Sequence, residues 1–179
     1  GHGGSTAASA VDDVTPTAYG ESWDVIGSTT ATQTNGGTNK HGAIGGFGDD
    51  NIFMYNAPSL VDGLGLNISY VPSHTDRVGS SISWAVEYTG VEGLTLGYAQ
   101  GEDNATAGSE TDNDTMYIKY AFGPLTVGVQ ESEIDASTAA ASDEFSAAGI
   151  TYQVNDDLTI GYHESAYNAG DKGVDQEST

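Results

Sequence analysis

Apolar and polar residues alternate along most of the chain after residue 50, with a period of two residues. Such alternation is typical of β-strands with two different faces, because successive side chains point to opposite sides of a strand. A helix is disfavoured, since Gly and Thr fill many of the positions between the apolar residues. The pattern predicts strands at 51–57, 64–72, 80–89, 94–102, 115–122, 125–134, 145–154 and 158–167.

These strands come in pairs that are joined by short turns. The second strand of each pair begins with a similar motif that starts with Leu, at Leu64, Leu94, Leu125 and Leu158, so the offsets are 30, 31 and 33 residues. A period of this size indicates a repeated supersecondary unit, here one β-hairpin. The connections between pairs are longer and acidic, as at 103–114 and 135–144.

The chain divides into three parts within a single domain. Residues 1–50 are rich in Gly, Ser, Thr and Asn and are predicted to form a long loop region. A loop of that length in a compact domain is usually functional. Residues 51–168 carry the hairpin repeats, and residues 169–179 are predicted to begin an acidic loop.

The two faces of the predicted strands differ in an unusual way. One face carries large apolar and aromatic residues, such as Ile82, Trp84, Val86 and Tyr88, whereas the other carries small ones, such as Ser81, Ser83 and Ala85. Soluble sheets usually place charged residues on the wet face. The pattern therefore favours a barrel with lipid outside and water inside, whose strands have the length of tilted membrane-spanning strands.

Composition and charge exclude several functions. The chain has 179 residues, with 4 Lys plus Arg, 26 Asp plus Glu and a net charge of -22. A nucleic-acid partner is excluded on this balance, because phosphate binding needs clustered basic residues. Cys is absent, which excludes disulfides and thiol chemistry. No P-loop, nucleophile elbow or metal-binding His motif is present, so we expect no enzyme activity.

The order of several motifs resembles Gram-negative general-diffusion porins, and marine alphaproteobacterial porins in particular. The stretch from Gly46 to Pro58 is similar to the end of a porin constriction loop that runs into the next strand. The hairpins 88–98 and 120–128 look like porin periplasmic turns. The resemblance covers nearly the whole chain.

This resemblance implies an antiparallel transmembrane β-barrel of the porin type, often of sixteen strands. It also implies passive diffusion of small hydrophilic solutes or ions across the bacterial outer membrane, by a homotrimer embedded in outer-membrane lipid. About eight strands are predicted here, and the sequence ends at Glu177-Ser178-Thr179 without a terminal aromatic strand. We therefore expect a central portion of a longer porin.

Four residues are candidates for the pore. By the resemblance, Asp49 and Asp50 end the inward-folded loop near the constriction, while Glu87 and Lys119 lie on the polar face of the strands. An acidic vestibule attracts cations and repels anions over about 8 Å at physiological salt. We therefore predict a preference for cations.

No cofactor is expected, although calcium in the acidic loops is kept as an alternative. Carboxylate oxygens are ligands that calcium accepts, and Asp112 and Asp114 are the candidates. Two other interpretations also stay open. One is a complete eight-stranded barrel that serves as an outer-membrane anchor, and the other is a soluble, acidic, calcium-binding surface-layer or adhesin module.

Overall fold

The computed structural model describes residues 15–16, 52–59, 61–73, 79–106, 109–136, 143–169 and 174–178. The regular structure in these ranges is all β-strand. The strands are β1 (Phe53–Asn56), β2 (Leu64–Val71), β3 (Ser81–Val91), β4 (Leu94–Thr106), β5 (Ser109–Phe122), β6 (Leu125–Ala136), β7 (Asp143–Asn155), β8 (Leu158–Ala169) and β9 (Val174–Ser178). Among the described residues, no helix is long and apolar enough to cross a membrane.

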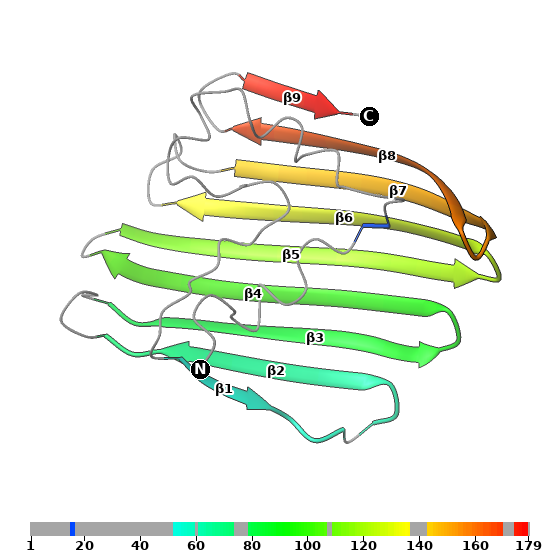
Figure 1. The fold of residues 1–179 in the computed structure, drawn as a ribbon. Coiled ribbons are helices and arrows are strands. Elements are labelled where there is room, and N and C mark those ends of the chain that lie inside the picture. The colour runs from blue at the N-terminus through cyan, green and yellow to red at the C-terminus, as the bar shows by residue number, and fades with distance from the viewer. Residues whose placement is uncertain are drawn as a thin grey trace.

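The nine strands form one antiparallel sheet in which each strand pairs with the next along the chain. Figure 1 shows this order from β1 at one edge to β9 at the other. The sheet is open between these two edge strands in the described part of the chain. The predicted all-β, antiparallel fold is confirmed, and each of the eight predicted strands corresponds to one observed strand.

Short turns close the hairpins on one side of the sheet. Gly63, Gly93 and Gly123 adopt positive φ angles of 74°, 77° and 56° in the turns before β2, β4 and β6. Residues other than Gly rarely adopt this conformation because of their Cβ atom, so Gly at these positions favours the tight turns. The turn before β8 is different, because the Asn155 side-chain oxygen accepts a hydrogen bond from the Asp157 backbone N–H at 2.9 Å.

Two predicted boundaries are wrong. The sequence predicts a loop at 103–114, but β4 continues to Thr106 and β5 begins at Ser109. The ladder is regular up to the pair of Asp103 with Thr111, which includes the pair of Glu102 with Asp112, and its register shifts between Asp103 and Thr106. Residues 174–178, predicted to lie within an acidic loop, form β9 against β8. Both errors arise because the strands continue beyond the point where apolar residues stop alternating with polar ones.

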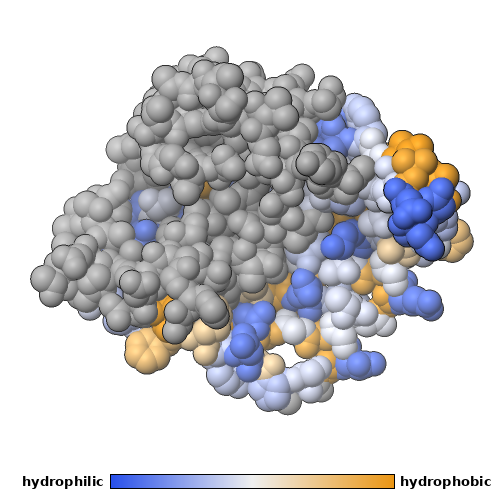
Figure 2. Space-filling model, viewed as in Figure 1, coloured by the Kyte–Doolittle hydropathy of each residue, from blue (hydrophilic) through white to orange (hydrophobic). Residues whose placement is uncertain are grey.

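The sheet is inverted relative to a soluble protein. Large apolar side chains of one face are exposed, for example Met116 at 51%, Phe122 at 69% and Ile160 at 59%. We call this the outward face. The opposite, inner face is largely covered, and its most deeply buried large side chains are mainly polar, including Gln130, Asn113 and Thr115. Figure 2 looks onto the side of the sheet seen in Figure 1, where hydrophobic residues show at the right-hand edge and at the lower left, with hydrophilic residues between them.

Candidate functional site

The apolar part of the outward face has a sharp boundary with a polar part on the side of the long loops. The last apolar residue before the boundary is Ile82 on β3, Tyr98 on β4, Met116 on β5, Val129 on β6, Ala148 on β7 and Tyr162 on β8. Beyond it, outward positions carry Gln100, Glu102, Asp114, Glu131, Glu133, Glu144 and Glu164. An apolar zone next to a carboxylate zone is the expected outer surface of a protein half immersed in a bilayer.

This boundary shifts along the strands from one strand to the next. The size of the shifts gives the angle between the strands and the boundary. Ile82 pairs with Glu102, so the boundary retreats by four residues between β3 and β4. It retreats by two more between Met116 and Val129, and by two between Ala148 and Tyr162. Eight residues over five strand spacings correspond to about 27 Å along the strands against about 24 Å across them. If the boundary marks the membrane surface, the strands tilt by about 45–50°, close to the 35–45° typical of membrane barrels.

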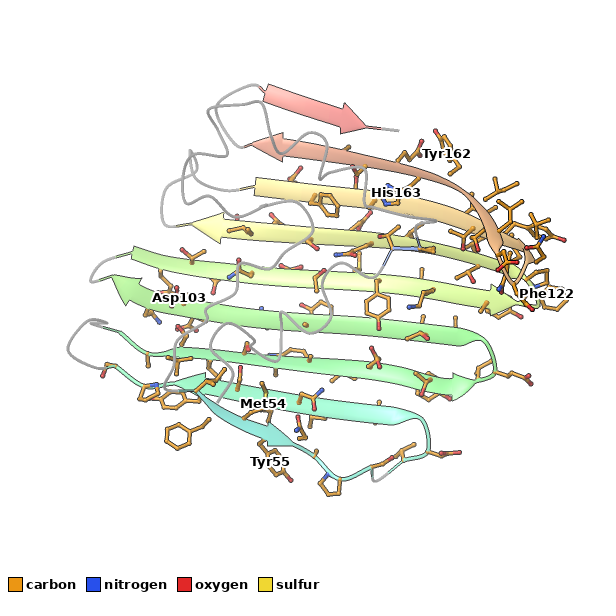
Figure 3. All side chains as sticks on the ribbon, viewed as in Figure 1. Met54, Tyr55, Asp103, Phe122, Tyr162 and His163 are labelled. Atoms are coloured by element: carbon orange, nitrogen blue, oxygen red, sulfur yellow. The ribbon has the colours of Figure 1, made fainter. Side chains whose placement is uncertain are left out.

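Aromatic residues lie at both ends of the apolar zone. Phe122 is at the short-turn end, as Figure 3 shows, and Tyr162 is the last apolar outward residue of β8 before Glu164. Trp84 and Tyr98 lie on adjacent strands, with ring centroids 5.4 Å apart and planes tilted by 53°. Aromatic rings of this kind are enriched at membrane interfaces.

Hydroxyl and amide groups hydrogen-bond to one another along the inner face. The Ser69 and Ser83 hydroxyl oxygens are 2.6 Å apart, and those of Thr115 and Ser132 are 2.5 Å apart. The Gln130 side-chain amide donates to the Ser132 hydroxyl at 3.3 Å. These bonds satisfy buried polar groups on the strands themselves, so the inner face is polar without carrying many charges.

Glu87 is held in place by Tyr117. The two residues lie on β3 and β5, with Gly97 of β4 between them in register. The Tyr117 hydroxyl donates a hydrogen bond to the Glu87 carboxylate. A Cβ atom on Gly97 would clash with the Tyr117 ring, so the ring can cross β4 only because residue 97 has no side chain.

Thr15 and Pro16 lie against the inner face of β6 and β7, as the short blue segment in Figure 1 shows. Thr15 is 7% exposed, and its hydroxyl donates to the Gln130 side-chain oxygen at 3.4 Å. Gly128 and Gly149 pair with each other in register directly beneath Pro16. A segment that precedes the first strand is thus in contact with the middle of the sheet.

The structure places two of the four predicted pore residues. Glu87 and Lys119 are both partly exposed on the inner face, as expected, but on different register rows, because Lys119 pairs with Thr95 and Gly128. Lys119 is the one Lys or Arg in the described ranges. Asp49 and Asp50 lie outside the described residues.

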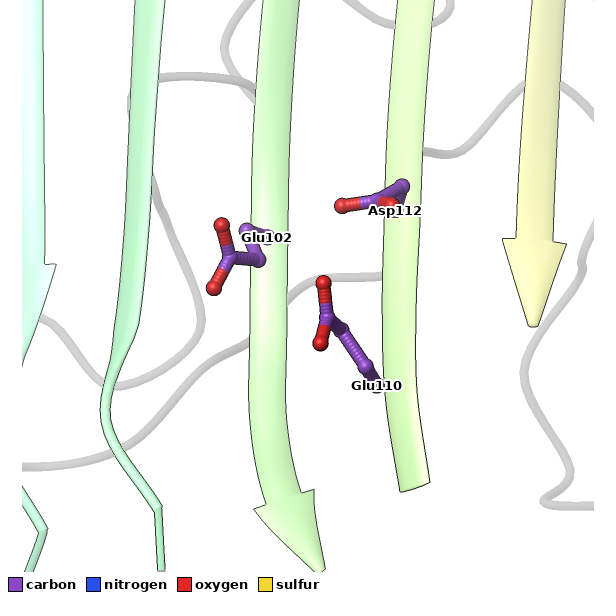
Figure 4. Close-up of side chains that lie close together, drawn as sticks. All are labelled: Glu102, Glu110 and Asp112. Carbon is purple, nitrogen blue, oxygen red and sulfur yellow. The ribbon is translucent and has the colours of Figure 1, made fainter. Parts of the chain in front are cut away.

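The calcium candidates are on the outward face. Asp112 and Asp114 belong to β5 and not to a loop, so that expectation is corrected. Asp112 lies near Glu102 and Glu110, and the carboxylate oxygens of these three exposed residues are within 4.8 Å of one another (Figure 4). Asp114 is two residues further along β5, where it pairs with Gln100, and it is not part of this group.

Two further inner-face residues are not among the sequence-based candidates. The alternation places Tyr117 on the polar face without giving it a role, and it places Asp103 in a loop. Asp103 instead accepts a hydrogen bond from the Ser81 hydroxyl on the inner face near the long-loop end, the opposite end from Phe122 in Figure 3. Continuing the period-2 alternation through 103–114 would have placed Asp103 on the inner face.

The comparison with known families agrees with this geometry. Residues 4–179 match the family described as Gram-negative porin. No curated protein sequence matches the chain. A porin is a channel and not an enzyme, and an outward apolar face around a polar inner face is the surface such a channel needs. The chain belongs to the Gram-negative porin family, whose members form β-barrel channels in the bacterial outer membrane.

Proposed function

We propose that the sheet is part of the wall of a passive diffusion channel for small hydrophilic solutes and that the channel prefers cations. The inversion of the sheet is the observation that carries this proposal. Ile82, Ile118 and Ile150 are 49%, 43% and 42% exposed on the outward face, whereas Ser83 and Thr115 are buried on the inner one. Lipid on the first face and water on the second would solvate both surfaces.

The charge distribution supports the preference for cations. The inner face carries Glu87 and Asp103 against Lys119 in the described ranges, and the whole chain has a net charge of -22. Tyr117 fixes the Glu87 carboxylate on the inner wall. A fixed negative charge inside a narrow aqueous path raises the local concentration of cations and lowers that of anions.

We also propose that the channel assembles as a homotrimer in outer-membrane lipid. The support is the resemblance to general-diffusion porins together with family membership. Chemical crosslinking of the native protein in membranes tests the assembly. A ladder that ends at three subunits is expected, and a monomer band alone would contradict this part of the proposal.

The channel itself is tested by reconstituting the native protein into a planar bilayer. Stepwise increases in current are expected, and their size should rise with salt concentration, as for a water-filled path. The reversal potential in a KCl gradient then reports selectivity. We expect its sign to show potassium crossing more readily than chloride.

Different failures have different meanings. An absence of current steps from a protein that inserts into the bilayer would refute the channel and favour an anchor barrel. Current steps with a reversal potential of the opposite sign would refute only the preference for cations. Solubility of the native protein without detergent would contradict both the channel and the anchor barrel, because the outward apolar face would then be covered by something other than lipid.

A further inference from the structure

The contact between Thr15–Pro16 and the inner face is too close for ordinary side chains. A Cβ atom on Gly149 would clash with the Pro16 carbonyl oxygen and would lie 3.0 Å from the Thr15 methyl group. A Cβ atom on Gly128 would lie 2.6 Å from Cδ of the Pro16 ring. Cβ atoms essentially never approach other heavy atoms so closely, so any other residue at either position would push this segment off the wall.

The turn geometry of the backbone does not account for these two glycines. Neither has a positive φ, since the positive-φ glycines of the described residues are Gly63, Gly93 and Gly123. In the interior of a strand, Gly weakens the strand and often marks a site where another backbone approaches closely. Gly128 and Gly149 stand opposite each other on neighbouring strands, which makes one continuous gap in the side-chain layer.

The gap has side chains around it. Lys119 and His163 flank it on the same register row, and Gln130 is two residues further along β6, on the same face. Cδ2 of His163 is 3.2 Å from the Cβ position of Gly149. Thr15 and Pro16, which fill the gap, are therefore surrounded by side chains and backbone of the wall. The hydroxyl of the buried Thr15 donates a hydrogen bond to the Gln130 side chain.

We propose that Gly128 and Gly149 form an anchoring notch that holds the Thr15–Pro16 segment flat against the channel wall. The anchored segment has a fixed position in the aqueous path, so it sets the local cross-section of the channel. Gly128, Gly149 and Gln130 are positioning residues that act on permeation through this segment. The expected effect on current rests on the proposed channel function. The contact between the two glycines and the Thr15–Pro16 segment does not depend on it.

The notch is tested by substitutions that fill it. Gly128→Ala and Gly149→Ala place a methyl group in the gap without backbone strain, and Gly65→Ala is the matched control. Gly65 also lies on the inner face, and its Cβ position has the Glu87 carbonyl oxygen at 3.9 Å, an ordinary contact. Open-channel current noise is expected to rise several-fold in both notch variants, because the released segment fluctuates in the path, and to stay unchanged in Gly65→Ala.

A second substitution separates the two contacts. Pro16→Ala removes the ring atoms that clash with a methyl group at position 128, but it keeps the carbonyl oxygen that clashes with a side chain at position 149. We therefore expect Pro16→Ala to restore quiet currents in Gly128→Ala and not in Gly149→Ala. Equal rescue of both variants, or of neither, would overturn the assigned contacts.

A readout that is independent of current uses the absence of native cysteine. In a Thr15→Cys protein the thiol is expected to react slowly with a water-soluble maleimide, since residue 15 is buried. Adding Gly149→Ala should speed labelling by about fivefold or more, because the lower end of the usual cost of overpacking shifts a local equilibrium by about that factor. Rapid labelling of the Thr15→Cys protein itself would overturn the notch. Slow labelling in a protein that passes no current would support the notch and refute the channel.

Discussion

The Tyr117 hydroxyl donates a hydrogen bond to the Glu87 carboxylate across the whole width of β4. The contact joins β3 to β5, which are not neighbours in the sheet. It exists because Gly97 leaves a gap that the Tyr117 ring fills. An inner-face charge is thereby given a fixed position by a donor two strands away.

Removing this donor is expected to destabilise the protein. Tyr117→Phe keeps the ring over Gly97 but leaves Glu87 without the hydroxyl. Hydrogen bonds to charged groups are worth about 1.5–3 kcal/mol, and the partial exposure of Glu87 lowers the expected loss to about 1–2 kcal/mol. Urea unfolding in lipid vesicles measures it. Tyr120→Phe on the outward face of the same strand is the matched control, and an equal loss there would contradict the special role of Tyr117.

Filling the gap at Gly97 is expected to break the same contact. Gly97→Ala places a methyl group where the Tyr117 ring lies, so the ring must move and the hydrogen bond to Glu87 is lost. The effects of Gly97→Ala and Tyr117→Phe should then not add in the double variant, because residues in direct contact are energetically coupled. Additive losses in a double-mutant cycle would show that the two residues act separately.

Selectivity is expected to depend on inner-face charge and not on outward charge. A unit charge about 10 Å from a permeating ion contributes about 0.4 kcal/mol in water, which is roughly a factor of two for each ion. Because the potassium ion is attracted and the chloride ion is repelled, the potassium-to-chloride ratio changes by about a factor of four. Glu87→Gln should lower the potassium-to-chloride ratio by about that factor, as measured by reversal potential. Glu131→Gln on the outward face should leave the ratio unchanged. A larger shift from Glu131→Gln would mean that the faces are assigned the wrong way round.

A charge in the apolar zone is expected to be costly. Lys at the bilayer midplane of a barrel costs about 2–4 kcal/mol, and near the interfaces about 0–1 kcal/mol. We expect the larger loss for Ile118→Lys in the middle of the zone and little loss for Ser146→Lys, which lies beyond its boundary and pairs with Glu131. Urea unfolding in vesicles distinguishes them. Equal, small losses would favour a sheet that faces water on both sides.

We expect calcium to act at the outward carboxylates. Glu102, Glu110 and Asp112 repel one another at close range, so Asp112→Asn should raise the thermal midpoint in a chelator. Added calcium should raise the midpoint of the wild type by more than that of Asp112→Asn. Equal responses of the two proteins would rule out this group as a calcium site.

The local pattern of residues determined the strands and their inversion. Ile82, Trp84, Val86 and Tyr88 alternate with Ser81, Ser83 and Ala85, so a period of two puts the two sets on opposite faces. The small size of the second set favoured the inverted arrangement, with the apolar face toward lipid. Gly93 and Gly123 mark turns for a similarly local reason, because each positive φ is a property of one residue and its neighbours. Family resemblance then gave the channel interpretation, which the match over residues 4–179 supports.

Only the tertiary structure decided where the strands continue and what crosses the inner face. Around Glu102 and Asp112 the hydrophobic signal stops while the backbone ladder goes on, since ladder hydrogen bonds do not depend on side-chain polarity. The contacts of Tyr117 with Glu87 and of Pro16 with Gly149 join residues 30 and 133 positions apart in the chain. The sequence shows which positions are glycine and therefore leave a gap on the inner face. Which ring or backbone segment fills each gap depends on the strand register and on contacts between residues far apart in the chain.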